Sequence, residues 1–192
     1  DARTLVMDSV MADINYAIEN ISMTNDNTRS LVTKWVAYAF KSRLCLFEGT
    51  FRKYHTELGL TASADTWLNE ATLAARKVID EAGYSLNTSG GLGKSYRQIF
   101  INPSPLSNEV LLASAMDLTL NELHDANWYW TSGTYGDKAS FIRTFINTYL
   151  MLDGTPFTAT SGYETMTFMD EVKDRDLRLM QTIRLGEYKR TS

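Results

Sequence analysis

The sequence predicts a mainly α-helical protein whose second half is rich in loops. Between residues 4 and 83, apolar side chains recur at steps of three and four, the spacing of one helix face. Polar, turn-forming stretches separate these runs. Beyond residue 83, glycine, proline and clustered aromatic residues replace the pattern. We therefore expect a helical scaffold over residues 1–83 and a loop-rich segment of the same domain over residues 84–192.

The first predicted helix spans residues 4–21. Its apolar stripe advances by four, three, four and three residues, through Met7, Met11, Ile14, Ile18 and Ile21. A polar stretch over residues 23–30 follows and is typical of a turn. Ser30 or Thr33 is then a suitable N-cap for the next helix.

The central predicted helix spans residues 31–55. It carries two apolar stripes, one through Val32, Trp35, Ala39, Ser42 and Leu46 and the other through Phe40, Leu44, Phe47, Phe51 and Tyr54. A helix with two apolar sides is expected to have neighbours on both. The solvent face is predicted to hold Lys34, Lys41, Glu48 and His55, which lie seven apart. The single cysteine, Cys45, is interpreted as an inert core thiol.

The third predicted helix begins near Ser63 and ends at Gly83, which suits a left-handed cap. Its stripe is Trp67, Ala71, Ala74, Ala75, Val78 and Ala82. Because this face is mostly alanine, another helix can approach it closely. A bulky aromatic residue followed by small residues is similar to helix-pair repeats of the tetratricopeptide kind, although no fixed period repeats here.

Shorter elements are expected after Gly83. Residues 87–93 form a glycine-rich loop without the spacing of a phosphate-binding loop. A short helical turn precedes Pro103, and residues 109–113 form a buried apolar run in an extended conformation. Residues 141–152 are helical or extended and end in a turn at residues 153–154. A local ion-pair cluster is predicted for Asp174, Arg175, Asp176 and Arg178.

Composition excludes several classes of function. The chain of 192 residues has a net charge of -4, and a nucleic-acid partner usually requires a basic face. No apolar run approaches the ~20 residues of a membrane-spanning helix. His55 and His124 lie far apart without a third ligand nearby, so we expect neither a zinc site nor any cofactor.

The segment over residues 116–138 has the most unusual composition. Its rings are Trp128, Tyr129, Trp130 and Tyr135, beside Asn127, Ser132, Gly133 and Gly136. No helical stripe includes these rings, so we expect an irregular surface segment. Aromatic rings held on a loop stack on the flat faces of sugars. The alternative is a loop whose aromatic residues pack on the core, and the sequence leaves both open.

Five groups of residues occur in an order shared with one family. They are Val32-Thr33-Lys34 with Ala37 and Ser42-Arg43-Leu44-Cys45-Leu46-Phe47; Trp67-Leu68 with Ala71, Ala75, Val78-Ile79, Tyr84 and Leu86; Tyr96 and Ile99-Phe100 with Glu109-Val110-Leu111; Thr144-Phe145-Ile146-Asn147 and Tyr149 with Asp153-Gly154 and Pro156; and Asp174-Arg175-Asp176 with Arg178-Leu179. Together they resemble the SusD/RagB family of outer-membrane nutrient-binding lipoproteins across nearly the whole chain. Members of that family are longer, and Asp1 follows no leader segment, so we expect a central piece of such a protein.

The resemblance implies an α-α superhelix of tetratricopeptide-like helix pairs with a loop-rich face that binds glycan. It also implies a lipoprotein at the cell surface of the outer membrane, whose partner is a TonB-dependent (SusC-like) transporter. The helical scaffold would then provide a surface for that transporter. The expected ligand-binding residues are Trp128, Trp130 and Tyr135, which stack on sugar rings, with Asn127 or Asp125 bonding to hydroxyl groups.

Two other classes of function are weighed against this one. A glycosidase would use two carboxylates such as Asp117, Glu122 or Asp125, but neighbours in sequence give no evidence of the fixed separation that hydrolysis needs. A helical repeat scaffold would bind a protein partner and no sugar. We expect no catalytic activity, and the sequence does not identify the glycan.

Overall fold

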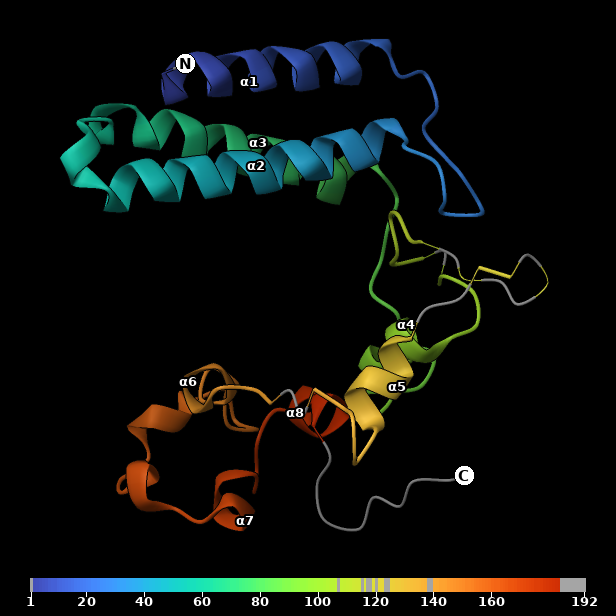
Figure 1. The fold of residues 1–192 in the computed structure, drawn as a ribbon, viewed down its shortest axis with the longest axis vertical. Helices are drawn as coiled ribbons and strands as arrows, with labels where there is room; N and C mark the ends of the chain where they lie inside the picture. The colour runs from blue at the N-terminus through green and yellow to red at the C-terminus, as the bar shows by residue number, and fades with distance from the viewer. Residues whose placement is uncertain are drawn as a thin grey trace. The chain divides into compact units, whose positions relative to one another are not determined.

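The computed structural model describes residues 2–106, 108–114, 116, 119, 121–122, 125–137 and 140–183. These residues are mainly α-helical, which confirms the coarser part of the prediction, a mainly α fold (Figure 1). In the described part of the chain, β structure is represented by isolated bridges that join Leu150 to Pro156 and Met151 to Arg175. Two compact units form, one from residues 1–86 and 104–115 and the other from residues 87–103 and 116–192.

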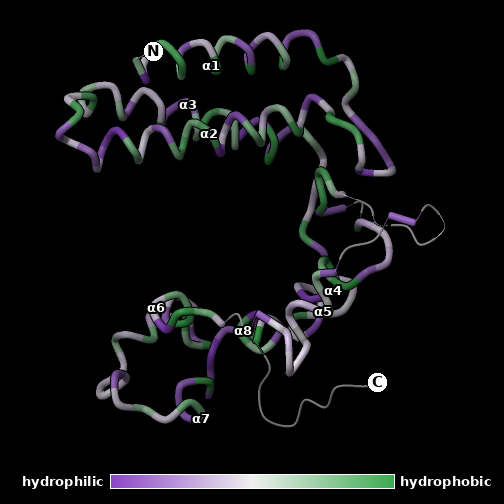
Figure 2. Tube along the Cα trace, in the orientation of Figure 1, coloured by the Kyte–Doolittle hydropathy of each residue, from purple (hydrophilic) through white to green (hydrophobic). Residues whose placement is uncertain are grey.

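The first unit contains three long helices, α1 (Arg3–Asn20), α2 (Lys34–Tyr54) and α3 (Ala64–Glu81). Two short 3₁₀ turns, η1 (Thr56–Leu58) and η2 (Thr61–Ser63), connect α2 to α3. All three helices were predicted within a few residues of these bounds. Figure 2 shows hydrophobic and hydrophilic positions interleaved along each of them, as expected for helices with one buried face.

The predicted helix ends are also confirmed. The Thr33 hydroxyl accepts a hydrogen bond from the Val36 amide (3.3 Å) and so caps α2. Gly83 follows α3 with a φ of 73°, in the left-handed region that glycine enters without steric cost.

The core of this unit lies where α1 and α3 meet α2. Ile14 and Ile18 of α1 pack on Ala37, and the α1 residues Met7 and Met11 pack on a buried cluster of Cys45, Trp67 and Ala71. Close approach of α2 and α3 depends on Gly49, where a Cβ atom would lie 2.8 Å from the Leu68 side chain. The alanine-rich face of α3 is therefore a contact face, as predicted.

The predicted solvent face of α2 is wrong for two of its members. Glu48 is fully buried, and Lys41 is largely buried, with its ammonium group 2.6 Å from a Glu70 carboxylate oxygen. The charged groups of Glu48 and Lys41 meet opposite charges from α1, α2 and α3, which allows them to be buried. Sequence spacing predicted a solvent-exposed position for Glu48 and Lys41, because spacing contains no information about their ion-pair partners on other helices.

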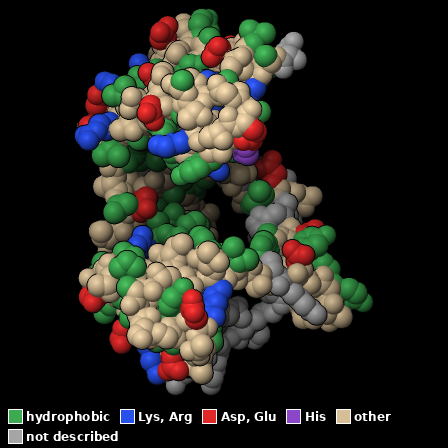
Figure 3. Space-filling view, turned by 90° about the vertical axis from the view of Figure 1, so that its left-hand side faces the viewer, with side chains coloured by type: hydrophobic (Ala, Val, Ile, Leu, Met, Phe, Trp, Pro, Cys, Tyr) green, Lys and Arg blue, Asp and Glu red, His purple; other side chains and the backbone are tan. Residues whose placement is uncertain are grey.

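The two apolar stripes of α2 are also placed differently from the prediction. The buried face lies between them and includes Val36, Ala37, Cys45 and Gly49. Phe40 and Phe47 remain exposed (57% and 60%) in the described structure, as does Tyr54. Hydrophobic side chains accordingly reach the surface in the space-filling view (Figure 3). The predicted neighbours on two sides are confirmed, because α2 packs on both α1 and α3. The stripe through Phe40 is divided: Leu44 packs on the α1–α2 core, whereas Phe40, Phe47 and Tyr54 face solvent.

The segment over residues 108–114 belongs to the first unit and is bonded to it at both ends. The Ala113 amide donates to the Arg29 carbonyl (2.7 Å), and the Ser85 amide donates to the Asn108 carbonyl (2.8 Å). The apolar run predicted over residues 109–113 therefore returns to the helices. The prediction of a buried, extended run is wrong: none of these five residues is buried, and Leu112 is exposed. The run begins in a turn, in which the Val110 amide donates to the Leu106 carbonyl (2.9 Å).

The second unit is built from short helices and turns. Its helices are α4 (Ser95–Ile101), α5 (Ala126–Thr131), α6 (Arg143–Ile146), α7 (Phe168–Glu171) and α8 (Leu177–Thr182), with 3₁₀ turns η3 (Phe157–Ala159) and η4 (Tyr163–Thr165). The helical turn predicted before Pro103 is α4. The predicted turn at Asp153 is confirmed, because its carboxylate accepts from the Thr155 amide (2.9 Å) and Gly154 has a φ of 88°.

Buried Arg175 organises the end of this unit. Its guanidinium donates to three backbone carbonyls, those of Glu171 (2.6 Å), Ile146 (2.9 Å) and Tyr149 (2.8 Å). It also lies over the Phe157 ring, 3.8 Å from the centroid. The predicted ion-pair cluster is therefore right only for Asp176 and Arg178, which do pair, whereas Arg175 binds the main chain.

Candidate functional site

The predicted ligand residues lie on and around α5. The sequence analysis expected an irregular segment here, and that prediction is wrong for residues 126–131. The Tyr129 amide donates to the Asp125 carbonyl (3.0 Å), and the Ser132 amide donates to the Trp128 carbonyl (2.9 Å). A helix of six residues is too short to display a repeating apolar stripe, so periodicity could not reveal it.

The chain then folds back along α5. The Asp137 amide donates to the Tyr129 carbonyl (2.9 Å), and the Tyr135 amide donates to the Ser132 hydroxyl (3.2 Å). This return places the Tyr135 ring beside the Trp128 ring. Their centroids are 6.1 Å apart and their planes differ by 14°, so the two rings are nearly parallel. We call Trp128 and Tyr135 the ring pair.

The ring pair is open to solvent in the described structure. Trp128 is 51% exposed and Tyr135 is 75% exposed. Tyr129 contacts the edge of Trp128 (centroids 5.3 Å apart, planes at 85°) and so supports the orientation of that ring. Solvent-exposed rings held by a local hydrogen-bonded turn provide a stacking surface for a flat apolar face.

The other predicted site residues are not all brought together. Trp130 is 64% exposed, but it follows Trp128 by two positions and so points about 200° away around the helix. Asp125 precedes α5, is exposed, and makes no side-chain capping bond to α5. Asn127 lies in α5, and its side chain lies outside the described part of the structure. The structure thus supports Trp128 and Tyr135 as one group and separates Trp130 from it.

The residues weighed for catalysis and metal binding are only partly described. Asp117 and His124 lie outside the described residues, and Glu122 is exposed. In the described part of the chain, no group of three or more His, Cys, Asp or Glu side chains is placed to hold a metal ion. Burial raises the pKa of the Cys45 thiol to about 11, as expected for a core residue.

Gly136 is the residue on which the geometry of the ring pair depends. A Cβ atom at this position would lie 2.8 Å from the Tyr129 carbonyl oxygen and closer still to that of Ser132. We expect Gly136→Ala to displace Tyr135 from Trp128 and to change the near-ultraviolet circular dichroism of the aromatic residues. Gly133→Ala is the matched control, because a Cβ atom there meets nothing within 4 Å. Identical spectra for both variants would contradict this expectation.

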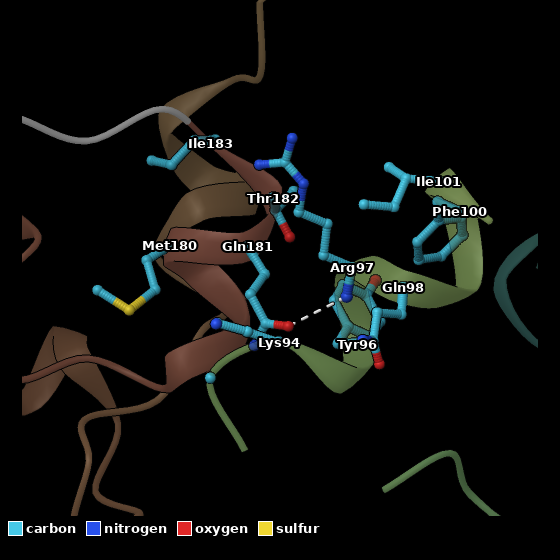
Figure 4. A pocket seen from close by; sticks show the side chains of 11 residues that line it. Lys94, Tyr96, Arg97, Gln98, Phe100, Ile101, Met180, Gln181, Thr182 and Ile183 are labelled. Carbon is cyan, nitrogen blue, oxygen red and sulfur yellow. Dashed lines mark hydrogen bonds between the residues drawn. The ribbon is translucent and has the colours of Figure 1, made fainter. Parts of the chain in front are cut away.

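A groove of about 950 Å³ lies between α4 and α8 in the same unit (Figure 4). Met180 of α8 and Ile183, which follows α8, line one side, and Phe100 and Ile101 of α4 line the other. The Arg97 amide donates to the Gln181 side-chain oxygen (3.0 Å) across a sequence separation of 84 residues. The sequence analysis missed this groove, because neither short helix carries a signal that identifies the other as its neighbour.

The groove is lined by cations and aromatic rings. Lys94 and Arg97 line it, and no carboxylate does so among its described residues. The Tyr96 and Phe100 rings meet edge to face, with centroids 5.3 Å apart. Tyr96 also lines a second hollow of about 400 Å³, which includes Tyr149 and Arg178.

A third hollow, of about 470 Å³, lies in the first unit. Its walls come mainly from α1 and the start of α2, with Leu112 at one edge, and are almost entirely apolar. Val10, Ile14, Val36 and Phe40 are among the lining residues, and these side chains offer no directional hydrogen bonds. This hollow therefore lacks the polar groups that a specific polar ligand would need.

Comparison of the chain with protein-family models, with curated proteins and with solved structures finds no match in any of the three. Among the described residues, no helix is both long enough and apolar enough to cross a membrane.

Proposed function

We propose that this protein binds glycan without catalysing its cleavage, and that the ring pair of Trp128 and Tyr135 is the stacking surface. The observation that carries the proposal is the exposure of two nearly parallel rings on a locally hydrogen-bonded turn. The C–H faces of pyranose rings are flat and apolar, so they cover such rings favourably. Asp125, exposed at the start of α5, is a candidate partner for sugar hydroxyl groups.

The ordered motifs support a more specific version of the proposal. They resemble the SusD/RagB family, so we propose a surface lipoprotein of the outer membrane that delivers oligosaccharide or polysaccharide to a SusC-like, TonB-dependent transporter. The hairpin of α2 and α3, with its alanine-rich contact face, is consistent with tetratricopeptide-like helix pairs. In this proposal the first unit is scaffold and the second unit is the ligand-binding part.

A protein-binding role is the second candidate, and one observation favours it. Phe40, Phe47 and Tyr54 form an exposed aromatic row along α2, although large rings normally favour burial. A transporter or another protein would cover this row. This role is compatible with glycan binding, because the row and the ring pair belong to different units.

Titration of tryptophan fluorescence with a panel of oligosaccharides tests the proposal. Trp128 and Trp130 are exposed, whereas Trp67 is buried. A ligand that binds on α5 is therefore expected to change the fluorescence of the exposed tryptophans and to leave that of Trp67 unchanged. A saturable change with one class of glycan, without released sugar after long incubation, is the expected result. Absence of any fluorescence or calorimetric response, in a sample whose circular dichroism shows the helices, would overturn it.

A further inference from the structure

We propose that the groove between α4 and α8 binds the carboxylate groups of an acidic oligosaccharide, one built from uronate units. This inference rests on the proposed function, because it takes the ligand to be a glycan, and it adds the chemical class of that glycan. Trp128 and Tyr135 are not among the residues of the groove, so the two surfaces are tested separately.

The charge of the groove is the first argument. The chain carries a net charge of -4, yet the groove is lined by the ammonium group of Lys94. Lys94 is exposed at the position before α4, at the mouth of the groove. An exposed ammonium group in a groove of an acidic protein attracts anions that the rest of the surface repels. Neutral glycans would gain nothing from this arrangement.

The shape and walls of the groove are the second argument. Its volume of about 950 Å³ falls within the range of small-molecule sites. The Tyr96 and Phe100 rings supply apolar surface, and Phe100 is largely exposed. A uronate unit combines a flat C–H face with one carboxylate, and it therefore matches rings that stand beside cations.

The rigidity of the groove is the third argument. The Gln181 amide nitrogen donates to the Leu92 carbonyl (2.9 Å), while its oxygen accepts from the Arg97 amide. The Gln98 side-chain oxygen accepts from the Ser89 hydroxyl (3.2 Å). These bonds join α4, the loop before it and α8, so the site is formed before a ligand arrives. A preformed site loses less entropy on binding.

The groove also has room for more than one sugar unit. Tyr96 separates it from the hollow of about 400 Å³ that Thr148, Tyr149 and Arg178 line. Arg178 is paired with Asp176, so the charge of this second hollow is largely compensated. A chain of uronate units would then place a carboxylate near Lys94 and continue past the Tyr96 ring.

The test is isothermal titration calorimetry with oligogalacturonate and with its fully methyl-esterified form of equal length. The ester keeps the sugar rings and removes the negative charge. We expect the acid to bind roughly tenfold more tightly than the ester, as charge-assisted hydrogen bonds to a carboxylate are stronger than neutral ones. Added salt should reduce this preference.

Lys94→Gln is the deciding variant, because it removes the charge and keeps much of the side-chain length. Its acid-to-ester preference should fall by about fivefold, the upper range for an exposed charge pair. Lys53→Gln, at an exposed position in α2, removes the same net charge elsewhere and should leave the preference unchanged. Circular dichroism checks that both variants fold.

The possible results separate this inference from the proposed function. The acidic-glycan site would be overturned if acid and ester bound equally well, or if Lys94→Gln and Lys53→Gln reduced the preference for the acid by the same factor. Either result would leave glycan binding by the ring pair intact. If no glycan of either charge binds, both proposals fail together. The inference is supported if the acid binds more tightly than the ester and if Lys94→Gln reduces that difference.

Discussion

Replacing Glu48 with alanine is expected to lower the free energy of unfolding by about 3–5 kcal/mol, the usual cost of breaking a buried ion pair from one side. Glu48 is fully buried, with one carboxylate oxygen 2.6 Å from an Arg3 nitrogen and the other 2.8 Å from the Arg52 Nε. Arg52 is buried too, and its guanidinium also donates to the Ser63 hydroxyl (2.8 Å). Without Glu48, Arg52 would remain in the core as an uncompensated charge.

Urea unfolding followed by circular dichroism measures this effect. The control is Glu57→Ala, because Glu57 is exposed and pairs only with His55 at the surface in the described structure. Its expected effect is much smaller than that of Glu48→Ala, because solvent screens an exposed ion pair. Arg3 is about one-third exposed, so Arg3→Ala should cost less than Glu48→Ala. Equal stability of the Glu48 and Glu57 variants would show that the network does not stabilise the three-helix unit.

The same network gives a pH dependence with a defined sign. Burial raises the pKa of Glu48, but hydrogen bonds and charges from Arg3 and Arg52 outweigh it and hold the pKa below its ordinary value of 4.5. The unfolded state therefore binds the proton first. The stabilisation is fully present above pH 4.5 and is lost as the pH falls through the lower pKa of the folded state. The stability difference between wild type and Glu48→Gln should shrink over that acidic range.

Trp128→Ala is expected to reduce glycan affinity about tenfold or more, whereas Trp130→Ala should change it little. Trp128 lies beside Tyr135 in the ring pair, and Trp130 points to the other side of α5. Removing a central aromatic contact typically costs more than 1–2 kcal/mol of binding free energy. Calorimetric titration with the glycan found in the panel measures both variants.

The two tryptophans form a matched pair of substitutions. They are the same residue type, both more than half exposed, and two positions apart on one short helix. A general effect on α5 would lower affinity in both variants. Trp128→Phe should keep part of the affinity, because a ring remains for stacking. Unchanged affinity in both Trp128→Ala and Tyr135→Ala would show that the ring pair is not the glycan site.

The periodic part of the sequence determined the three long helices by itself. The Met7-to-Ile21 stripe, the Thr33 cap and the Gly83 terminus act through neighbours three or four residues away, and each was predicted from spacing. The concentration of rings between residues 128 and 135 was visible too. These features are local, so the sequence contains everything needed to place them.

The tertiary structure alone decided which polar groups are buried and which helices form the groove. Glu48 is in the core because Arg3 and Arg52 meet it there, although its spacing matches a solvent face. Arg97 meets Gln181 across 84 residues, and Tyr135 reaches Trp128 because Gly136 leaves room for the turn. Each of these contacts depends on the positions of two chain segments at once. Periodicity describes one segment at a time, and so it contains no information about such contacts.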